Sequence, residues 1–453
     1  MFVKNRGHWS SKFAFIIAAT GAAVGLGNIW RFPYMVGMHG GSAFVLIYLI
    51  CILIMGIPVM MTEFLIGRRS QCNSVDAMVN EALRNGRSPH WGLVGWWGAF
   101  ALLLTLSMYS VVSGWVLAYI FKMLGRTLQG VTPLYITNTW TSFLHDPWQL
   151  TVWHGIFMIM TLWVVSRGVK RGLELACKIM MPLLYAILII LMVYASIAGN
   201  FYQAFIFLFT PDFSKIDASV VVAAMGHAFF SLALGAGAML VYGSYLRKNV
   251  SIATCTFIIV ILDVLVAFIA GLATFPILFA HGLPAESGPG LMFISLPISF
   301  SELPYGWLIG AAFFLVLLFA AWTSSINLAE PMVDIVIEKW SINRHTASII
   351  VGAVAWFIGL GSVLSFNVWE HVRLFNTWNI FEVATNLPID IILPIGGLCF
   401  AIFAGFAMTR KNTEQELAIR IPALYTLWRI AIRYIAPVCI VIIFVASFVD
   451  IVK

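Results

Sequence analysis

Polar side chains are rare within the long apolar runs of this chain, so the few that occur there draw attention. Burying such groups in lipid is costly, and membrane proteins keep them mainly where they serve a function. Their hydroxyl, amide and carboxylate oxygens are hard ligands that suit a small cation such as sodium, and no soft ligand accompanies them. The pattern predicts a cation site within a membrane, built from Asn28, Ser231, Asp263 and the group Thr323, Ser324, Ser325 and Asn327.

Two of these polar residues lie beside glycines that interrupt a helical run. Gly21, Gly25 and Gly27 precede Asn28, and Gly235 and Gly237 follow Ser231. A broken membrane helix exposes N–H groups at one half-helix start and carbonyls at the other half-helix end. Such breaks suit an anion and a small cation side by side. We therefore expect a carboxylate and sodium to bind together at the middle of the membrane.

The composition places the whole chain in a bilayer. It is 61% hydrophobic and 10% charged over 453 residues, with a mean hydropathy of +0.95. Windows of about 20 apolar residues predict an all-α integral membrane protein that forms a single domain over 1–453. We expect eleven spans, at 11–38, 43–67, 93–124, 150–166, 176–198, 219–245, 253–279, 305–338, 347–365, 376–408 and 430–450.

The two interrupted spans occupy corresponding positions. Each would be the first of five, which predicts one repeat over 11–198, a second over 219–408, and an extra span at 430–450. Because five is odd, the second repeat would start from the opposite side of the membrane. Matching interrupted segments in two inverted halves indicate the binding site of a transporter.

Charged residues set the expected orientation. If the N-terminus is cytoplasmic, most Lys and Arg fall in cytoplasmic loops, as the positive-inside rule requires. This asymmetry accounts for the net charge of +7 without a nucleic-acid partner. We expect a multi-pass protein of the cell's inner (plasma) membrane, with the lipid bilayer as its surroundings.

The stretch GLGNIWRFPY, preceded by His8 and Trp9, and the stretch TSSIN in the eighth span resemble the neurotransmitter:sodium symporter family. The resemblance covers nearly the whole chain. It implies a fold with spans 1 and 6 broken at mid-membrane, and sodium-coupled import of an amino acid by alternating access. It implies no covalent reaction, so we do not expect an enzyme.

The resemblance also implies two sodium sites and a substrate site. One sodium site would use Gly21, Val24, Ala320, Thr323 and Ser324. The other would use Ala23, Asn28, Ser231 and Asp263. The substrate carboxylate would lie on the Leu26 and Gly27 amides, the Tyr109 hydroxyl and the second sodium. The substrate side chain would contact Ala22, Thr105, Phe230, Ala233, Ala236, Ser324 and Leu328.

Asp263 departs from the family pattern, in which many members have asparagine. Chloride-dependent members bind chloride near this point, partly through a serine one turn later, where this chain has Ala267. A fixed carboxylate would replace that anion, so we expect transport with two sodium ions and no chloride. We also expect proton antiport if Asp263 takes up a proton when the site is empty.

The substrate set carries no charge, so a charged amino-acid side chain would be buried unpaired. This predicts a neutral L-amino acid. Ala236 stands where some relatives have a bulky aromatic residue, which leaves room for a large hydrophobic or aromatic ligand.

The resemblance further implies gates at both ends of the site. Arg31 and Phe230 would close the outer side, under a Gly- and Pro-rich loop at 281–304. The acid usually opposite Arg31 is replaced by Thr385, and Glu382, one turn earlier, is the expected substitute. The inner latch would use Arg6, Trp9, Tyr245 and Glu338, and Gly172 and Pro182 would let span 5 unwind.

Two rival functions stay open at this point: a gated channel or receptor-like binder of the same fold, and a membrane enzyme. No His-x-x-x-His or cysteine pair at helical spacing supports the second. His227 fits a packed core histidine better than a proton relay. The preferred amino acid and the oligomeric state also stay open.

Overall fold

A computed structural model describes residues 8–283, 288–374 and 378–452 of the chain, and within these ranges the secondary structure is helical, with no strand. Nine helices are long and apolar enough to cross a membrane, and the bent pair formed by α1 (Lys12–Ala23) and η1–α2 (Gly27–Arg31 and Phe32–Met38) makes a tenth. The two shorter helices α11 (Ala218–Ser231) and α12 (Ala238–Ser244) together occupy the predicted sixth span. The expected all-helical membrane architecture of about eleven spans is confirmed.

The nine continuous spans follow the predicted order. They are α3–α4 (Ser42–Ser70), η3–α6 (Pro89–Leu124), α8 (Pro147–Ser166), η4–α9 (Val169–Ala198), α13 (Ile252–Ala280), α15 (Gly306–Trp340), α16 (Arg344–Leu364), α17–α18 (Ile380–Ala407) and α20–α21 (Pro422–Ala446).

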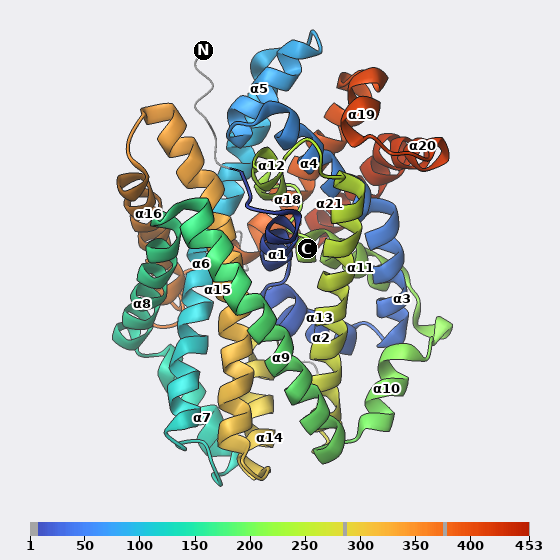
Figure 1. The fold of residues 1–453 in the computed structure, drawn as a ribbon. Helices are drawn as coiled ribbons and strands as arrows, with labels where there is room; N and C mark the ends of the chain where they lie inside the picture. Colours follow the sequence, from blue (N-terminus) through green and yellow to red (C-terminus); the bar gives the residue numbers. More distant parts are fainter. Residues whose placement is uncertain (1–7, 284–287, 375–377, 453) are drawn as a thin grey trace.

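Several bounds and short helices differ from the prediction. The fifth span begins at Val169 rather than 176, and the last begins at Pro422 rather than 430. Five short helices lie outside the spans: α5 (Ser74–Arg84), α7 (Pro133–Leu144), α10 (Phe201–Phe209), α14 (Leu296–Glu302) and α19 (Arg410–Leu417). Windows that search for long apolar runs pass over helices this short. Figure 1 shows α5 and α19 at one end of the bundle and α7, α10 and α14 at the other.

Span 1 is broken within the bundle. α1 ends where Val24 turns to extended backbone (φ −67°, ψ 105°), and the following helix is bent by 53° from α1. The residues of α1 from Ala14 to Ala23 are all buried, and α1 packs against α9, α13 and α15. In Figure 1, α1 and α2 lie inside the bundle, so the break is surrounded by protein rather than lipid.

Span 6 is broken between Leu232 and Gly237. Ala233, Gly235 and Gly237 have positive φ (51°, 88° and 74°), a conformation that ends a helix and that glycine adopts without strain. At Gly235 a Cβ would also come within 2.1 Å of the Leu393 carbonyl oxygen. A glycine is therefore required at this position both for the backbone angle and for the close approach of α18 (Leu393–Ile402).

Glu63 of α4 (Ile57–Ser70) holds this broken segment. Its Oε1 accepts a hydrogen bond of 2.7 Å from the Gly235 N–H, and its side chain is fully buried. Glu63 thus accepts a hydrogen bond from a backbone N–H that has no partner within a helix. The nearby Arg68 and Arg69 form ion pairs with Glu416 and Glu81.

Candidate functional site

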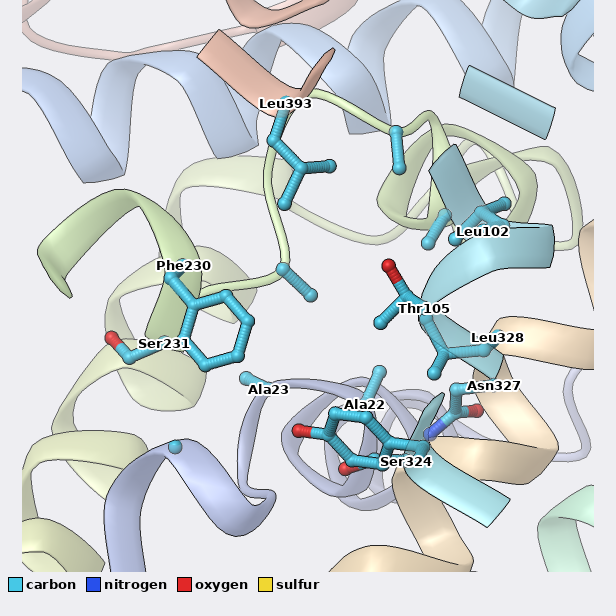
Figure 2. Close-up of a pocket in the computed structure, with 15 residues that line it drawn as sticks. Ala22, Ala23, Leu102, Thr105, Phe230, Ser231, Ser324, Asn327, Leu328 and Leu393 are labelled. Atoms are coloured by element: carbon cyan, nitrogen blue, oxygen red, sulfur yellow. The ribbon is translucent and has the colours of Figure 1, made fainter. Parts of the chain in front are cut away.

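A cavity lies between the two breaks. The ends of α1 and α11 meet α6 (Gly92–Leu124), α15 and α18 around it, and its volume is about 50 Å³. Figure 2 shows Phe230 and Ser231 on one side, Thr105 and Leu102 opposite, and Ser324, Asn327 and Leu328 on α15. Its lining residues are Ala22, Ala23, Gly27, Leu102, Thr105, Tyr109, Phe230, Ser231, Ala233, Ala236, Ala238, Ser324, Asn327, Leu328 and Leu393.

Almost all residues predicted to contact the substrate line this cavity. Leu26 is the exception, since it lines the outer cavity described below. Leu102, Ala238, Asn327 and Leu393 were not predicted as substrate contacts. Asn327 was singled out as a polar residue within a span, whereas the other three are ordinary apolar residues whose types gave no signal.

Residues predicted for one sodium site lie around Asn28 and Asp263. Asn28 Nδ2 donates to Asp263 Oδ1 at 2.8 Å, and Asn28 Oδ1 accepts from the Gly25 N–H at 3.2 Å. Asp263 Oδ2 is buried without a hydrogen-bond partner. Ser231 lies against Tyr48, with 3.4 Å between the hydroxyl oxygens. A buried carboxylate oxygen left unpaired beside hydroxyl, amide and carbonyl oxygens fits a small hard cation.

The other predicted sodium site joins α1 to α15. The Ser324 hydroxyl donates to the Val24 carbonyl at 3.2 Å, and the Thr323 hydroxyl donates to the Ala320 carbonyl at 3.1 Å. A Cβ on Gly21 would come within 3.4 Å of Thr323 Cβ. All five predicted ligands therefore lie at one contact between the two helices, and their oxygens are again hard ligands that suit sodium.

The start of the second half of span 1 faces Tyr109. The Tyr109 hydroxyl faces the backbone N–H groups of Leu26 and Gly27, and a Cβ on Gly25 would approach it to 3.1 Å. The first N–H groups of a helix have no partner within it, so this point attracts anions. The arrangement can hold a carboxylate between the helix start and the phenol.

Phe230 separates this cavity from an outer one. Gly27, Tyr109 and Phe230 line both, and the outer cavity extends to Trp30, Gly288 and Phe381. Trp30 Nε1 donates to the Gly288 carbonyl at 3.1 Å, so the predicted outer loop reaches the cavity mouth. Residues 284–287 of that loop lie outside the described ranges.

Arg31 lies on the outer side of Phe230, with Cζ 4.8 Å from the ring centroid. Its Nη1 is buried without a hydrogen-bond partner. The strongest carboxylate acting on Arg31 is that of Asp390 in η7 (Leu387–Ile392), and both residues line one small cavity. The expected partner, Glu382, instead caps α17 (Ile380–Asn386) through reciprocal hydrogen bonds of 2.8 Å with Asn379. The sequence did not indicate Asp390 as this partner. Asp390 lies in the π-helical turn η7, and such a turn cannot be recognised from the sequence.

The inner end of the site is closed by aromatic and charged residues. Trp9 Nε1 donates to the Tyr242 carbonyl at 3.1 Å, and the Tyr245 hydroxyl donates to Asp334 Oδ2 at 2.6 Å and Glu330 Oε1 at 3.2 Å. Arg344 forms an ion pair with the fully buried Glu330.

The structure shows a further acid beside the residues of the predicted latch. Asp334, one turn before Glu338, receives the Tyr245 hydroxyl, while Glu338 accepts hydrogen bonds from Asn73, including 3.1 Å from its N–H. Trp9 and Tyr245 contact each other as expected, with ring centroids 5.9 Å apart. Arg6, the fourth predicted member, lies outside the described residues.

The inner end of span 5 begins with a π-helical turn, η4 (Val169–Glu174). A Cβ on Gly172 would come within 2.1 Å of the Val164 carbonyl oxygen, so glycine permits this packing. Glu174 accepts from the Ser10 N–H at 3.1 Å and from Lys178 Nζ at 2.6 Å. Pro182 lies within α9 (Leu175–Ala198). The segment predicted to unwind is therefore irregular and is tied to the N-terminal segment by side-chain hydrogen bonds.

A helical membrane protein with two helices broken around one central cavity has the architecture of a secondary transporter. Comparison with known proteins agrees with this class. The model of the sodium:neurotransmitter symporter family matches residues 6–143 and 134–453. The chain belongs to the sodium:neurotransmitter symporter family, as the resemblance of its motifs implied, and this is a family of transporters rather than enzymes.

Its relatives include bacterial and mammalian transporters. A sodium-dependent transporter of Bacillus subtilis (strain 168) is 34% identical over 439 residues, which is 96% of each chain. The sodium- and chloride-dependent GABA transporter 2 of Mus musculus is 26% identical over 92% of this chain and 76% of its own length. The crystal structure of MhsT in complex with L-phenylalanine superposes with a TM-score of 0.90 at 38% identity, covering 98% of this chain and 100% of MhsT.

Proposed function

We propose that this protein is a sodium-coupled symporter that imports neutral, bulky hydrophobic or aromatic L-amino acids by alternating access. The observation that carries the proposal is the cavity between the breaks. Its walls are apolar or uncharged, while helix N–H groups and the Tyr109 hydroxyl lie at one end for a carboxylate. That MhsT binds L-phenylalanine in a closely similar structure supports an aromatic amino acid.

Two sodium ions would couple to this ligand. The ion held by Ala23, Asn28, Ser231 and Asp263 would lie beside the substrate carboxylate, since Ala23 and Ser231 line the same cavity. Each charge would complete the coordination of the other, so each would raise the affinity for the other. The ion between α1 and α15 would hold the two helices together and favour the closed inner side.

We further propose that transport needs no chloride. The Asp263 carboxylate would supply a fixed negative charge beside the sodium ion, and the support for this role is that its Oδ2 is buried without a hydrogen-bond partner among the described residues. Proton antiport would follow if Asp263 takes up a proton on the empty return step. A pH jump that leaves sodium-coupled uptake unchanged would count against this last step.

Uptake into proteoliposomes tests the proposal. Labelled phenylalanine should accumulate against its gradient when sodium is higher outside, and potassium should not replace sodium. Exchanging external chloride for gluconate should leave the rate unchanged. A gated channel would equilibrate the label without accumulation, and an enzyme would return a chemically altered product, so either result would reject symport.

A further inference from the structure

Asn327 is a buried polar side chain that no other residue in the described part of the chain satisfies. It is 2% exposed, and both its Oδ1 and its Nδ2 lack a hydrogen-bond partner. It lines the central cavity on α15, between Ser324 and Leu328 (Figure 2). Buried amide groups in native proteins are normally paired, because an unpaired one costs about 1–3 kcal/mol.

Ser324 and Thr105, two other polar residues that line the cavity, do not share this condition. Ser324 Oγ donates to the Val24 carbonyl at 3.2 Å, and Thr105 Oγ1 donates to the Ala101 carbonyl of its own helix at 2.8 Å. Asn327 is thus the polar side chain of the cavity whose hydrogen-bonding capacity is left for an occupant. Because both of its polar atoms are unpaired, no hydrogen bond fixes the amide orientation, and a 180° flip would turn its oxygen to the point where its NH2 group lay.

The rest of the wall limits what the occupant can be. Leu102, Leu328 and Leu393 are aliphatic, and Ala233 and Ala236 leave space where larger side chains would fill it. A charged side chain would have no counter-ion here. The matching ligand has a large apolar body with a single polar group on it, which describes an indole ring.

We propose that Asn327 accepts a hydrogen bond from the side chain of the substrate, and that the preferred substrate is an aromatic amino acid whose ring carries an N–H, of which tryptophan is the natural example. This inference rests on the proposed function, because the backbone carboxylate must lie at Leu26, Gly27 and Tyr109. With the carboxylate there, the side chain extends between α6 and α15 towards Asn327. Asn327 is then a specificity residue rather than a sodium ligand.

Binding of tryptophan and of 3-benzothienyl-L-alanine tests the inference, because the second ligand replaces the ring N–H by sulfur and keeps the shape. In sodium, the protein should bind tryptophan about tenfold more tightly, the worth of one hydrogen bond to a buried acceptor. In Asn327→Leu the two affinities should become equal while phenylalanine still binds. In the control Ser362→Ala, which removes a buried, unpaired hydroxyl on α16 outside the cavity lining, the tenfold preference should persist.

A thermal-unfolding measurement without ligand separates recognition from a structural role. Replacing an unpaired buried amide by an apolar group of similar shape should leave the melting temperature unchanged or raise it. A clear loss of stability in Asn327→Leu would show that the amide is satisfied within the protein and would overturn the inference.

The binding outcomes are distinct from a failure of the proposed function. Equal affinity of the two ligands for the unmodified protein, or a preference that survives in Asn327→Leu, would overturn the role of Asn327 while leaving symport intact. Tighter binding of glutamine than of tryptophan would overturn the proposed substrate class. Indifference of all ligand binding to sodium would overturn the proposed function itself.

Discussion

At the scale of single residues, the site is built from polar groups placed where ordinary packing would not place them. Asp263 and Asn327 each leave a buried polar atom without a protein partner, and Asp263 is held by Asn28 so that its second oxygen is available. Such groups cost stability when the site is empty. They are therefore the positions at which a change of one atom type should alter ligand preference rather than folding.

Asp263→Asn keeps the shape of this side chain and removes its charge. We expect sodium-coupled uptake to be lost in chloride-free buffer, because the sodium ion and the substrate would no longer be balanced by a fixed carboxylate. Addition of chloride should restore uptake if the anion can take the place of the carboxylate. Uptake rates with chloride and with gluconate measure this directly, and uptake that is unaltered and indifferent to chloride would contradict the assignment.

Asp390→Asn tests which acid serves the outer gate. Asp390 acts on Arg31 across a shared small cavity, whereas Glu382 is engaged in capping its own helix. We expect faster dissociation of labelled substrate from Asp390→Asn, since closure over the site would lose the attraction between the two charges. Thr385→Val is the matched control on the same span, because the Thr385 hydroxyl bonds the Phe381 carbonyl of its own helix at 2.8 Å. If Thr385→Val speeds dissociation and Asp390→Asn does not, the residue that serves the gate would be at position 385, where relatives have their acid.

At the scale of elements, the irregular helix segments determine what can move. The π-helical turn η4 begins span 5, and Gly172 within it contacts the Val164 carbonyl of α8 closely. Cys177, one turn further along, is fully buried, and a Cβ on Gly21 would come within 3.3 Å of its sulfur. Span 5 thus covers one of the proposed sodium sites, and unwinding of η4 would expose it to water.

Reactivity of Cys177 should report this unwinding. In a variant in which the other cysteines are replaced, a thiol reagent should modify Cys177 faster in potassium than in sodium with substrate, because sodium stabilises the closed state. Gly172→Ala should make modification fast even in sodium, since its methyl group cannot fit beside Val164. Equal rates in both salts would show that span 5 does not open. The cysteines to be replaced are Cys51, Cys72, Cys255, Cys399 and Cys439.

At the scale of the whole molecule, two groups of contacts close the cavity from opposite sides. Phe230 and Arg31 cover it outside, and the cluster of Tyr245, Glu330, Asp334 and Arg344 closes it inside. Alternating access requires that these groups do not open together. At the proposed sites, sodium and substrate would bind between these two groups. Their binding would favour one closed arrangement over the other only if their affinity for the two differs.

Arg344→Gln should shift this balance towards the inward-open form. It would leave the buried Glu330 carboxylate unpaired, a change that typically costs about 3–5 kcal/mol. We expect weaker apparent sodium affinity and faster Cys177 modification. The double variant Arg344→Gln with Glu330→Gln should recover much of both properties, since no unpaired charge remains. Wild-type sodium affinity in Arg344→Gln would show that this ion pair does not hold the inner side closed.

The sequence by itself determined the membrane class, the order of the spans and the two breaks. These follow from apolar run length and from local groups of glycines, which act on the chain near them. The resemblance of its motifs to the family named most of the cavity lining, because those motifs identify which residues of spans 1, 3, 6 and 8 correspond to the family's substrate site. Only the tertiary structure placed Glu63 under the Gly235 N–H, Asp390 beside Arg31 and Asp334 against Tyr245. These contacts join residues far apart in the chain, and the turn of each helix decides which of several nearby acids faces inward.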